Sequence, residues 1–296
     1  EEGDTEENTP DTGAPADGGI APAAPAATSL TLTLEPEGQE VPPAVLAPTP
    51  DEGSLVDTLE LKGNVEPRRV LIVCRQHGNE PAGTEGAMRF LREYATTDDP
   101  RKLDILRKVT FLVVPMLNGD GAEKYQRRNA RNVDLNRDWL AQSQPETRAI
   151  VRAVAAWRPD LVMDLHELAT SDWTASFVEA MEPEAGASIA VGDACNAAIA
   201  AVVGPLRAQE MRVYARPVFN YREPRLAHRY FAVKRGVPTI LVETRRAGDV
   251  PLVHRATVHY ASIVAAARYM AGEESGTPAR VIAAWLEPGN GSDYRA

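Results

Sequence analysis

Residues 70–81 read VLIVCRQHGNEP and change character part-way along. The first four residues are apolar and mostly β-branched, which predicts a buried strand. The polar part that follows carries His77 and Glu80, three residues apart. In open α/β sheets, ligands bind in the crevice at the carboxyl ends of the strands. Residues 70–81 therefore predict an α/β protein with a functional turn directly after a strand.

Apolar runs alternate with helical patterns along most of the chain. Strands are expected at 59–61, 70–73, 109–114, 160–165, 174–180, 212–218 and 237–242, and helices at 82–94, 103–106, 145–157, 186–203, 226–234, 252–271 and 278–286. A capping box formed by Ser143 and Glu146 is expected to begin the helix at 145–157. Alternation of this kind predicts an α/β three-layer sandwich, with a mixed, mostly parallel sheet covered by helices on both faces.

Charge is distributed unevenly between the start of the chain and the rest. The 296 residues carry a formal net charge of −10, yet residues 1–60 hold 14 Asp and Glu and no Lys or Arg. The remaining residues, with 28 acidic and 32 basic side chains, are close to neutral. We therefore expect an acidic, Pro/Ala-rich tail or linker, largely disordered, at 1–54 and one folded domain at 55–296.

The composition also limits the partners and the compartment. The sequence shows no basic footprint for nucleic acid, and no apolar run approaches the ~18 residues that a membrane-spanning helix needs. An acidic, Pro/Ala-rich start at Glu1 is typical of mature exported proteins, so we expect a secreted or periplasmic location, with or without a lipid anchor on a removed N-terminal segment. Two cysteines, Cys74 and Cys195, are too few for a disulfide framework and are expected to be buried thiols. The sequence leaves the oligomeric state open.

Three residues that can bind a metal or accept a proton each follow an apolar run: His77, His166 and Glu243. Because the carboxyl ends of neighbouring parallel strands lie at one edge of a sheet, these residues are expected to meet in one crevice. The polar stretch 118–139 follows a fourth apolar run and can reach the same place.

Two histidines and a glutamate are a standard ligand set for one catalytic Zn²⁺, with the fourth position left open for water. His77 and Glu80 on one turn can reach a single ion, and His166 supplies the third ligand. Zinc polarises a carbonyl and lowers the pKa of its bound water to about 7. A further carboxylate must then take the proton of the water, and Glu243 is placed for that.

These residues resemble the zinc carboxypeptidase (funnelin) family, including its succinylglutamate desuccinylase/aspartoacylase-like relatives. The resemblance covers roughly residues 55–272. It rests on motifs in a fixed order, namely His77-x-x-Glu80, Asn118-Gly-Asp-Gly121, Asn136-Arg137 in VDLNR, His166 in DLHE and Glu243 in ETRRAG. Each motif alone is short enough to arise by chance, and the joint order is what carries the resemblance.

The resemblance implies a metal site and its supporting carboxylate. His77, Glu80 and His166 would hold one zinc ion, and Asp134 would orient His77, as metal-bound histidines usually require. Asp164 and Glu167 flank His166. Each is expected either to orient a metal-binding residue or to be a charge at the end of the strand.

The resemblance also implies how a substrate is bound and converted. Glu243 would be the general base, and Asn136 with Arg137 would clamp the terminal carboxylate of the substrate. Tyr221 would cap the substrate, by its spacing before Glu243. One arginine would stabilise the oxyanion; Arg127 is the first candidate, with Arg128 and Arg131 as alternatives.

Three functions remain open on this chemistry. The first is a zinc metallocarboxypeptidase that hydrolyses the C-terminal peptide bond of a peptide, including a cell-wall peptide. The second is a zinc-dependent deacylase of small N-acyl amino acids, and the third is an inactive binding module. The deacylase relatives typically carry a β-rich domain after the catalytic glutamate, whereas the fifty or so residues after Glu243 have helical patterns, which favours the peptidase. The compact spacing between His77 and His166 is nearer to the deacylases.

Overall fold

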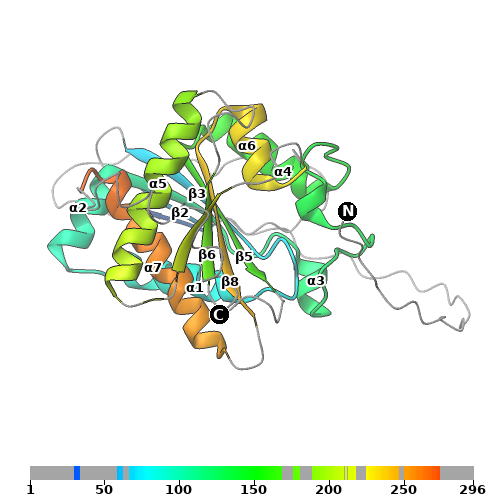
Figure 1. Ribbon diagram of the computed structural model, residues 1–296, viewed down its shortest axis with the longest axis horizontal. Helices are drawn as coiled ribbons and strands as arrows, with labels where there is room; N and C mark the ends of the chain where they lie inside the picture. Colours follow the sequence, from blue (N-terminus) through cyan, green and yellow to red (C-terminus); the bar gives the residue numbers. More distant parts are fainter. Residues whose placement is uncertain are drawn as a thin grey trace, which may run out of the picture.

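An eight-stranded sheet lies between two layers of helices (Figure 1). The computed structural model describes residues 30–33, 59–62, 67–168, 176–180, 189–209, 211, 213–217, 225–246 and 250–273. None of the helices in these ranges is long and apolar enough to cross a membrane. Tyr221 and the helix expected at 278–286 lie outside the described residues. The division of the chain at residue 54 stays a prediction.

The sheet is mixed and mostly parallel. Its strands are β1 (Leu30–Thr33), β2 (Leu59–Lys62), β3 (Arg68–Cys74), β4 (Val109–Val114), β5 (Leu161–Leu168), β6 (Ser176–Ala180), β7 (Val213–Pro217) and β8 (Thr239–Arg245). They are ordered β1-β2-β4-β3-β5-β8-β6-β7 across the sheet. Two neighbouring pairs, β2–β4 and β6–β8, are antiparallel, and the other five pairs are parallel. The predicted sheet type is therefore confirmed.

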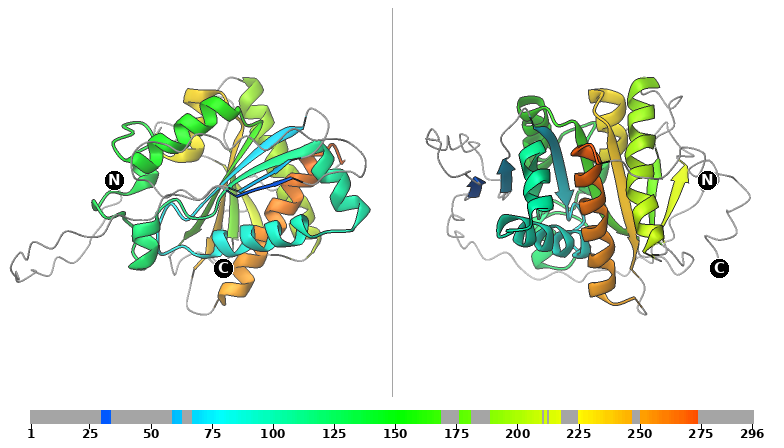
Figure 2. Two further views of the ribbon diagram at one scale, coloured as in Figure 1. Left: turned by 180° about the vertical axis from the view of Figure 1, so that it is seen from behind. Right: turned by 90° about the vertical axis from the view of Figure 1, so that its left-hand side faces the viewer.

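Helices cover both faces of the sheet, as the three-layer prediction requires. They are α1 (Ala82–Ala95), α2 (Pro100–Lys108), α3 (Gly119–Glu123), α4 (Pro145–Trp157), α5 (Ile189–Ala208), α6 (Ala227–Arg235) and α7 (Leu252–Met270), with a 3-10 turn at Leu135–Arg137. Helices α1, α5 and α7 lie on one face and α4 and α6 on the other (Figure 2).

Strand β3 shows why both layers form. Alternate side chains of a strand point to opposite faces of the sheet. Val70 and Ile72 pack in the same core as Phe90 of α1, whereas Leu71 and Val73 pack in the other core, which includes Phe231 of α6. The apolar segment 70–73 of β3 is buried on both faces and thus needs a helical layer on each side.

Strands β5 and β8 are longer than the sequence predicted. The apolar runs were expected to end before His166 and Glu243, but both residues lie inside their strands and pair with each other in the parallel register. The polar residues His166 and Glu243 do not end these strands, because their face of the sheet borders a cavity. The alternate residues, Leu165 and Val242, point to the other face and stay in the core.

The capping box predicted for α4 is wrong. The N-cap residue is Gln144, and its side chain makes no capping bond. Asp138 accepts hydrogen bonds from the backbone N–H groups of Ser143 and Gln144 and from the hydroxyl of Thr147. A carboxylate from the preceding loop thus binds the backbone N–H of Ser143, which a capping box would have paired with Glu146.

Gly78 allows the His77 turn to lie directly against α3, the short helix that contains Gly121. A Cβ atom on Gly78 would lie 1.9 Å from the carbonyl carbon of Gly121, and backbone at that distance cannot move aside cheaply. The N–H of Gly78 also donates to the carbonyl of Arg127. The absence of a side chain at residue 78 is therefore what brings these two segments together.

Gly78→Ala is expected to lower the free energy of unfolding by about 1–3 kcal/mol, the usual cost of forcing extra atoms into a packed site. Urea unfolding monitored by circular dichroism measures it. Gly119→Ala is the matched control, because a Cβ there meets no atom within 4 Å. Equal losses in the two variants would contradict the close approach as the cause.

Candidate metal centre

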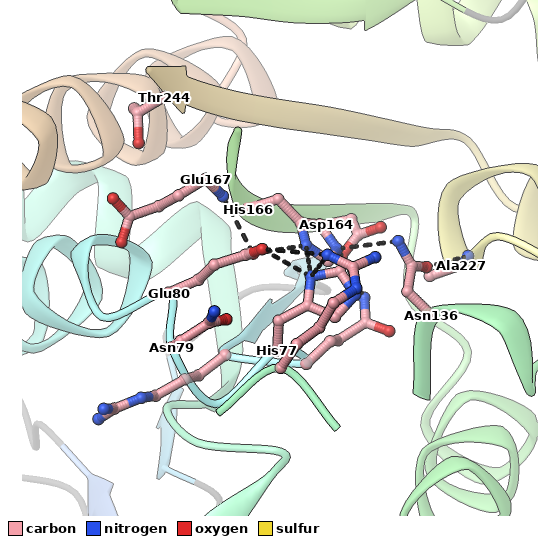
Figure 3. Close-up of polar contacts among 12 residues, drawn as sticks. His77, Asn79, Glu80, Asn136, Asp164, His166, Glu167, Ala227 and Thr244 are labelled. Atoms are coloured by element: carbon pink, nitrogen blue, oxygen red, sulfur yellow. Dashed lines mark hydrogen bonds and ion pairs between the residues drawn. The ribbon is translucent and has the colours of Figure 1, made fainter. Parts of the chain in front are cut away.

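Two histidines and a glutamate from distant parts of the chain meet at one point (Figure 3). His77 and Glu80 lie on the turn between β3 and α1, and His166 lies on β5. His77 Nδ1 is 2.7 Å from Glu80 Oε1, and His166 Nδ1 is 2.9 Å from Glu80 Oε2. The two Nδ1 atoms are 3.2 Å apart. All three side chains are buried.

The outer nitrogen of each imidazole contacts a carboxylate. His77 Nε2 is 3.0 Å from Asp134 Oδ1, and His166 Nε2 is 2.9 Å from Asp164 Oδ1. A carboxylate can only accept, so each Nε2 carries the proton and each Nδ1 is left with a lone pair. Asp164 thus orients the imidazole of His166, as Asp134 orients that of His77. The sequence alone had left this role of Asp164 open.

The converging atoms fit a zinc ion. Two imidazole lone pairs and a carboxylate facing one another inside the protein repel unless a cation or protons lie between them. Tetrahedral zinc has bonds of about 2.0–2.2 Å to nitrogen and oxygen, which places its ligand atoms roughly 3.3 Å apart. The 3.2 Å between the Nδ1 atoms of His77 and His166 is close to that spacing.

The electrostatics of the metal-free group point the same way. Burial alone would raise the pKa of Glu80, but His77 and His166 outweigh it and lower that pKa to about 2. Burial alone would lower the pKa of His166, but Asp164 and Glu80 hold it well above its ordinary value. Without a metal, a proton on His166 therefore offsets the negative charges of Asp164 and Glu80.

Zinc binding is expected to strengthen as the pH rises from about 6 to 8, because His166 must lose its proton before Nδ1 can bind a metal. The raised pKa of His166 keeps that proton in place at neutral pH. Each proton released gives up to about a tenfold change in affinity per pH unit. Calorimetric zinc titrations in two buffers of different ionisation enthalpy count the protons. Affinity that does not change with pH would contradict this assignment.

Gln76 supports the site and was not singled out from the sequence. Its Nε2 donates to Asp164 Oδ1 and lies 3.1 Å from His166 Nε2. Its Oε1 accepts from the indole N–H of Trp139 at 2.8 Å. An amide has both a donor and an acceptor, so Gln76 connects the buried carboxylate to the core. Its place directly before His77 was the only sequence signal.

Arg127 is the arginine that reaches the metal ligands. Its Nε and Nη2 donate to Asp134 Oδ2 at 3.0 and 2.9 Å, and its Nη1 is 3.3 Å from His77 Nδ1. Of the two alternatives, Arg128 is exposed and donates to a backbone carbonyl, and Arg131 is exposed. Only Arg127 of the three lines the cavity described below.

A cavity of about 370 Å³ opens onto the metal ligands. Its lining includes His77, Glu80, Arg127, Asn136, Arg137 and Glu243, the last of which pairs in register with His166 on the neighbouring strand. The structure thus brings to one cavity every predicted site residue that it describes except Asp134 and His166, which lie directly behind the lining. Tyr221 lies outside the described residues.

Most of these residues lie in a segment of the chain that matches a known protein family. Residues 49–173 match the zinc carboxypeptidase family. This segment contains His77, Glu80, Arg127, Asp134 and His166, and it confirms the resemblance seen in the motifs. Glu243 lies beyond the match to the zinc carboxypeptidases, so its place in the site rests on the register of β5 with β8.

Curated and solved relatives agree with the zinc carboxypeptidase match. A probable carboxypeptidase 2 of Trichophyton verrucosum is 36% identical over 99 residues, which is 33% of this chain and 19% of that protein. The chain thus spans about a fifth of the length of that curated relative.

Among solved structures, a metallo-carboxypeptidase from Burkholderia cenocepacia aligns with a TM-score of 0.62 and 22% identity, covering 75% of this chain and 62% of that one. A succinylglutamate desuccinylase/aspartoacylase from Rhodobacter sphaeroides aligns with a TM-score of 0.54 and 15% identity, covering 74% and 60%. At these identities the two structures show a shared fold.

Proposed function

We propose that this protein is a zinc-dependent carboxypeptidase that hydrolyses the C-terminal peptide bond of a peptide. The observation that supports this most is the content of one cavity. It combines a three-residue metal group, Glu243 on the adjoining strand, and the Asn136–Arg137 pair. A hydrolase needs the first two of these, and recognition of a free carboxyl terminus needs the third.

Each residue has a role in this proposal. His77, Glu80 and His166 would hold the zinc ion, which would supply polarisation of the scissile carbonyl and activation of water. Glu243 takes the proton of the attacking water and passes it to the leaving amine. Arg127 donates to the oxyanion.

Substrate recognition is assigned to two neighbouring residues. Asn136 accepts a hydrogen bond from the N–H of Ala227 through Oδ1 at 2.9 Å, so its amide is held in place at the start of α6. Arg137 follows it and provides a guanidinium for the terminal carboxylate.

A deacylase of small N-acyl amino acids remains the second candidate, because it would use the same metal group and base. The described residues after Glu243 favour the peptidase. Helix α7 follows β8 and packs against α1, in the part of the chain where the deacylase relatives were expected to carry a β-rich domain. The presence of the metal group, Arg127 and Glu243 together speaks against an inactive binding module.

The decisive experiment is a substrate panel assayed with and without a chelator. Peptides with a free C-terminus, the same peptides amidated, cell-wall peptides and N-acyl amino acids are compared. Cleavage of the free peptides alone, lost with chelation and restored by zinc, supports the proposal. Turnover of N-acyl amino acids only would establish the deacylase instead.

We also propose that the protein works outside the cytoplasm, where cell-wall peptides are found. The acidic, Pro/Ala-rich composition of residues 1–54 supports this. Cell fractionation with an antibody against the folded domain tests it, and a cytosolic pool alone would contradict it.

A further inference from the structure

Residues that line the cavity follow β8 and the residue after it, and the two ends of this lining differ chemically. Leu241, Glu243 and Arg246 line it in that order, so about 16 Å of extended chain separates the first from the last. Leu226 and His228 also line the cavity. His228 lies beside Asp164, and Asp164 pairs in register with Leu241, so Leu226 and His228 lie at the Leu241 end. The metal group lies beside Glu243, between the two ends.

The end near Leu226 is the one that would hold the substrate's terminal carboxylate. Asn136 is bonded to the backbone of Ala227, which places it and Arg137 beside Leu226 and His228. With that carboxylate on Arg137 and the scissile carbonyl at the metal group, the acyl part of the substrate must extend towards Arg246.

Arg246 brings a positive charge to this acyl-side end. Its backbone N–H continues the β5–β8 ladder to the carbonyl of Leu168, and its Nη1 donates to the carbonyl of Asn79 at 2.6 Å. No described carboxylate forms an ion pair with it, whereas Arg127 is neutralised by Asp134. A guanidinium has five donors, and one backbone bond leaves most of them available.

Asn79 adds a second polar group at the same end. Asn79 lines the cavity, and among the described residues its Oδ1 is buried with no hydrogen-bond partner. In Figure 3, Asn79 lies with Glu80 on one side of the two histidines, and Asn136 lies on the other side. A buried amide oxygen without a donor is uncommon and costs free energy, which a bound N–H group would recover.

We propose that Arg246 and Asn79 form a subsite for a substrate that carries a carboxylate on the acyl side of the scissile bond. Asn79 Oδ1 accepts a substrate N–H, and Arg246 binds the carboxylate. This inference rests on the proposed function and adds the substrate class: anionic at the terminal carboxyl group and again on the residue or acyl group before the cleaved bond.

The competing role for Arg246 is to hold the metal-binding turn through the carbonyl of Asn79. That role would affect every substrate equally and would alter zinc binding. Selection of an anionic substrate affects only the substrates that carry the second carboxylate. The two roles are therefore distinguished by the ratio of kcat/KM for a substrate with the second carboxylate to kcat/KM for a matched substrate without it.

The test uses the zinc-loaded protein and N-acetyl dipeptides that differ only in glutamate or glutamine before the same C-terminal residue. For the wild type, kcat/KM is expected to be about tenfold higher for the glutamate peptide, as a charge-assisted hydrogen bond would give. In Arg246→Met this ratio is expected to fall to about one, through loss of rate on the glutamate peptide, while zinc content stays at one ion per chain.

Arg128→Met is the matched control, because Arg128 is an exposed arginine near the site that also donates to a backbone carbonyl but does not line the cavity. It should keep the tenfold ratio. A second arm compares N-succinyl with N-butanoyl amino acids, which separates an anionic acyl group from an anionic residue as the source of the carboxylate.

A wild-type ratio of one in both arms overturns the subsite, and so does an equal loss on both substrates in Arg246→Met or a loss of zinc from that variant. In each of those cases hydrolysis of the uncharged peptide still stands, so the proposed function survives. Absence of cleavage of every peptide and acyl amino acid by the zinc-loaded protein overturns the proposed function and the subsite together.

Discussion

Glu243→Gln is expected to lower kcat by about 10²–10⁴-fold while zinc stays bound, because the amide cannot accept the proton of the attacking water. Glutamine keeps the size of the side chain, and Glu243 is not one of the three residues of the metal group. The affinity for substrate should change little, since the loss lies in the transition state. Steady-state kinetics on a cleaved peptide, with zinc measured by atomic absorption, give both values.

The control for this variant is Glu123→Gln, which removes one negative charge from an exposed residue of α3. It should turn over like the wild type. Near-normal turnover in Glu243→Gln would remove Glu243 as the base. Loss of zinc from that variant would instead make Glu243 a metal ligand, and the register with His166 would then need another explanation.

His166→Ala is expected to abolish zinc binding at micromolar concentrations and with it all hydrolysis. Loss of an outer carboxylate alone typically weakens metal affinity about 10–100-fold, and loss of a direct ligand costs more. The substitution also leaves the buried Asp164 without the imidazole that partners it, so the metal-free variant should be less stable than the metal-free wild type. Zinc content, activity and thermal unfolding measure the three effects.

His254→Ala is the matched histidine control, because His254 is exposed on the first turn of α7 and is not part of the metal group. Zinc content and activity should be unchanged in it. A stoichiometric zinc ion in His166→Ala would mean that the metal group has been assigned wrongly. Zinc bound to the native state stabilises it by an amount that grows with the logarithm of the free zinc concentration, so the wild type should unfold at a higher temperature with zinc than with a chelator.

Much of the fold could be predicted because strands and helices leave local patterns. The run at 109–114 coincides with β4, and the helix expected at 145–157 coincides with α4. The prediction was wrong where a local rule met a tertiary neighbour. The local pattern predicts strand ends at the polar residues of β5 and β8, although a cavity accommodates them. It also predicts a cap at Ser143, although the N-cap is Gln144 and Asp138 binds the N–H groups of both residues.

The site could be predicted to the level of residue types in a fixed order. His77, Glu80 and His166 carry the chemistry of a zinc ligand set, and short motifs record them whatever the chain does between them. No local pattern identifies Gln76 or Arg246, because their contacts are with residues 88 and 167 positions away. The same limit left Arg128 and Arg131 open as alternatives to Arg127 until the structure placed Arg127 in the cavity.

The sequence by itself determined a sheet covered on both faces and a metal ligand set, because apolar periodicity and ligand chemistry are properties of the residues. Only the tertiary structure decided how these residues act. Carboxylates from two other segments, Asp134 and Asp164, hold each imidazole with Nδ1 facing inward, and strand register sets Glu243 beside His166. Protonation, orientation and proximity depend on groups far apart in the chain, so they exist only once the chain has folded.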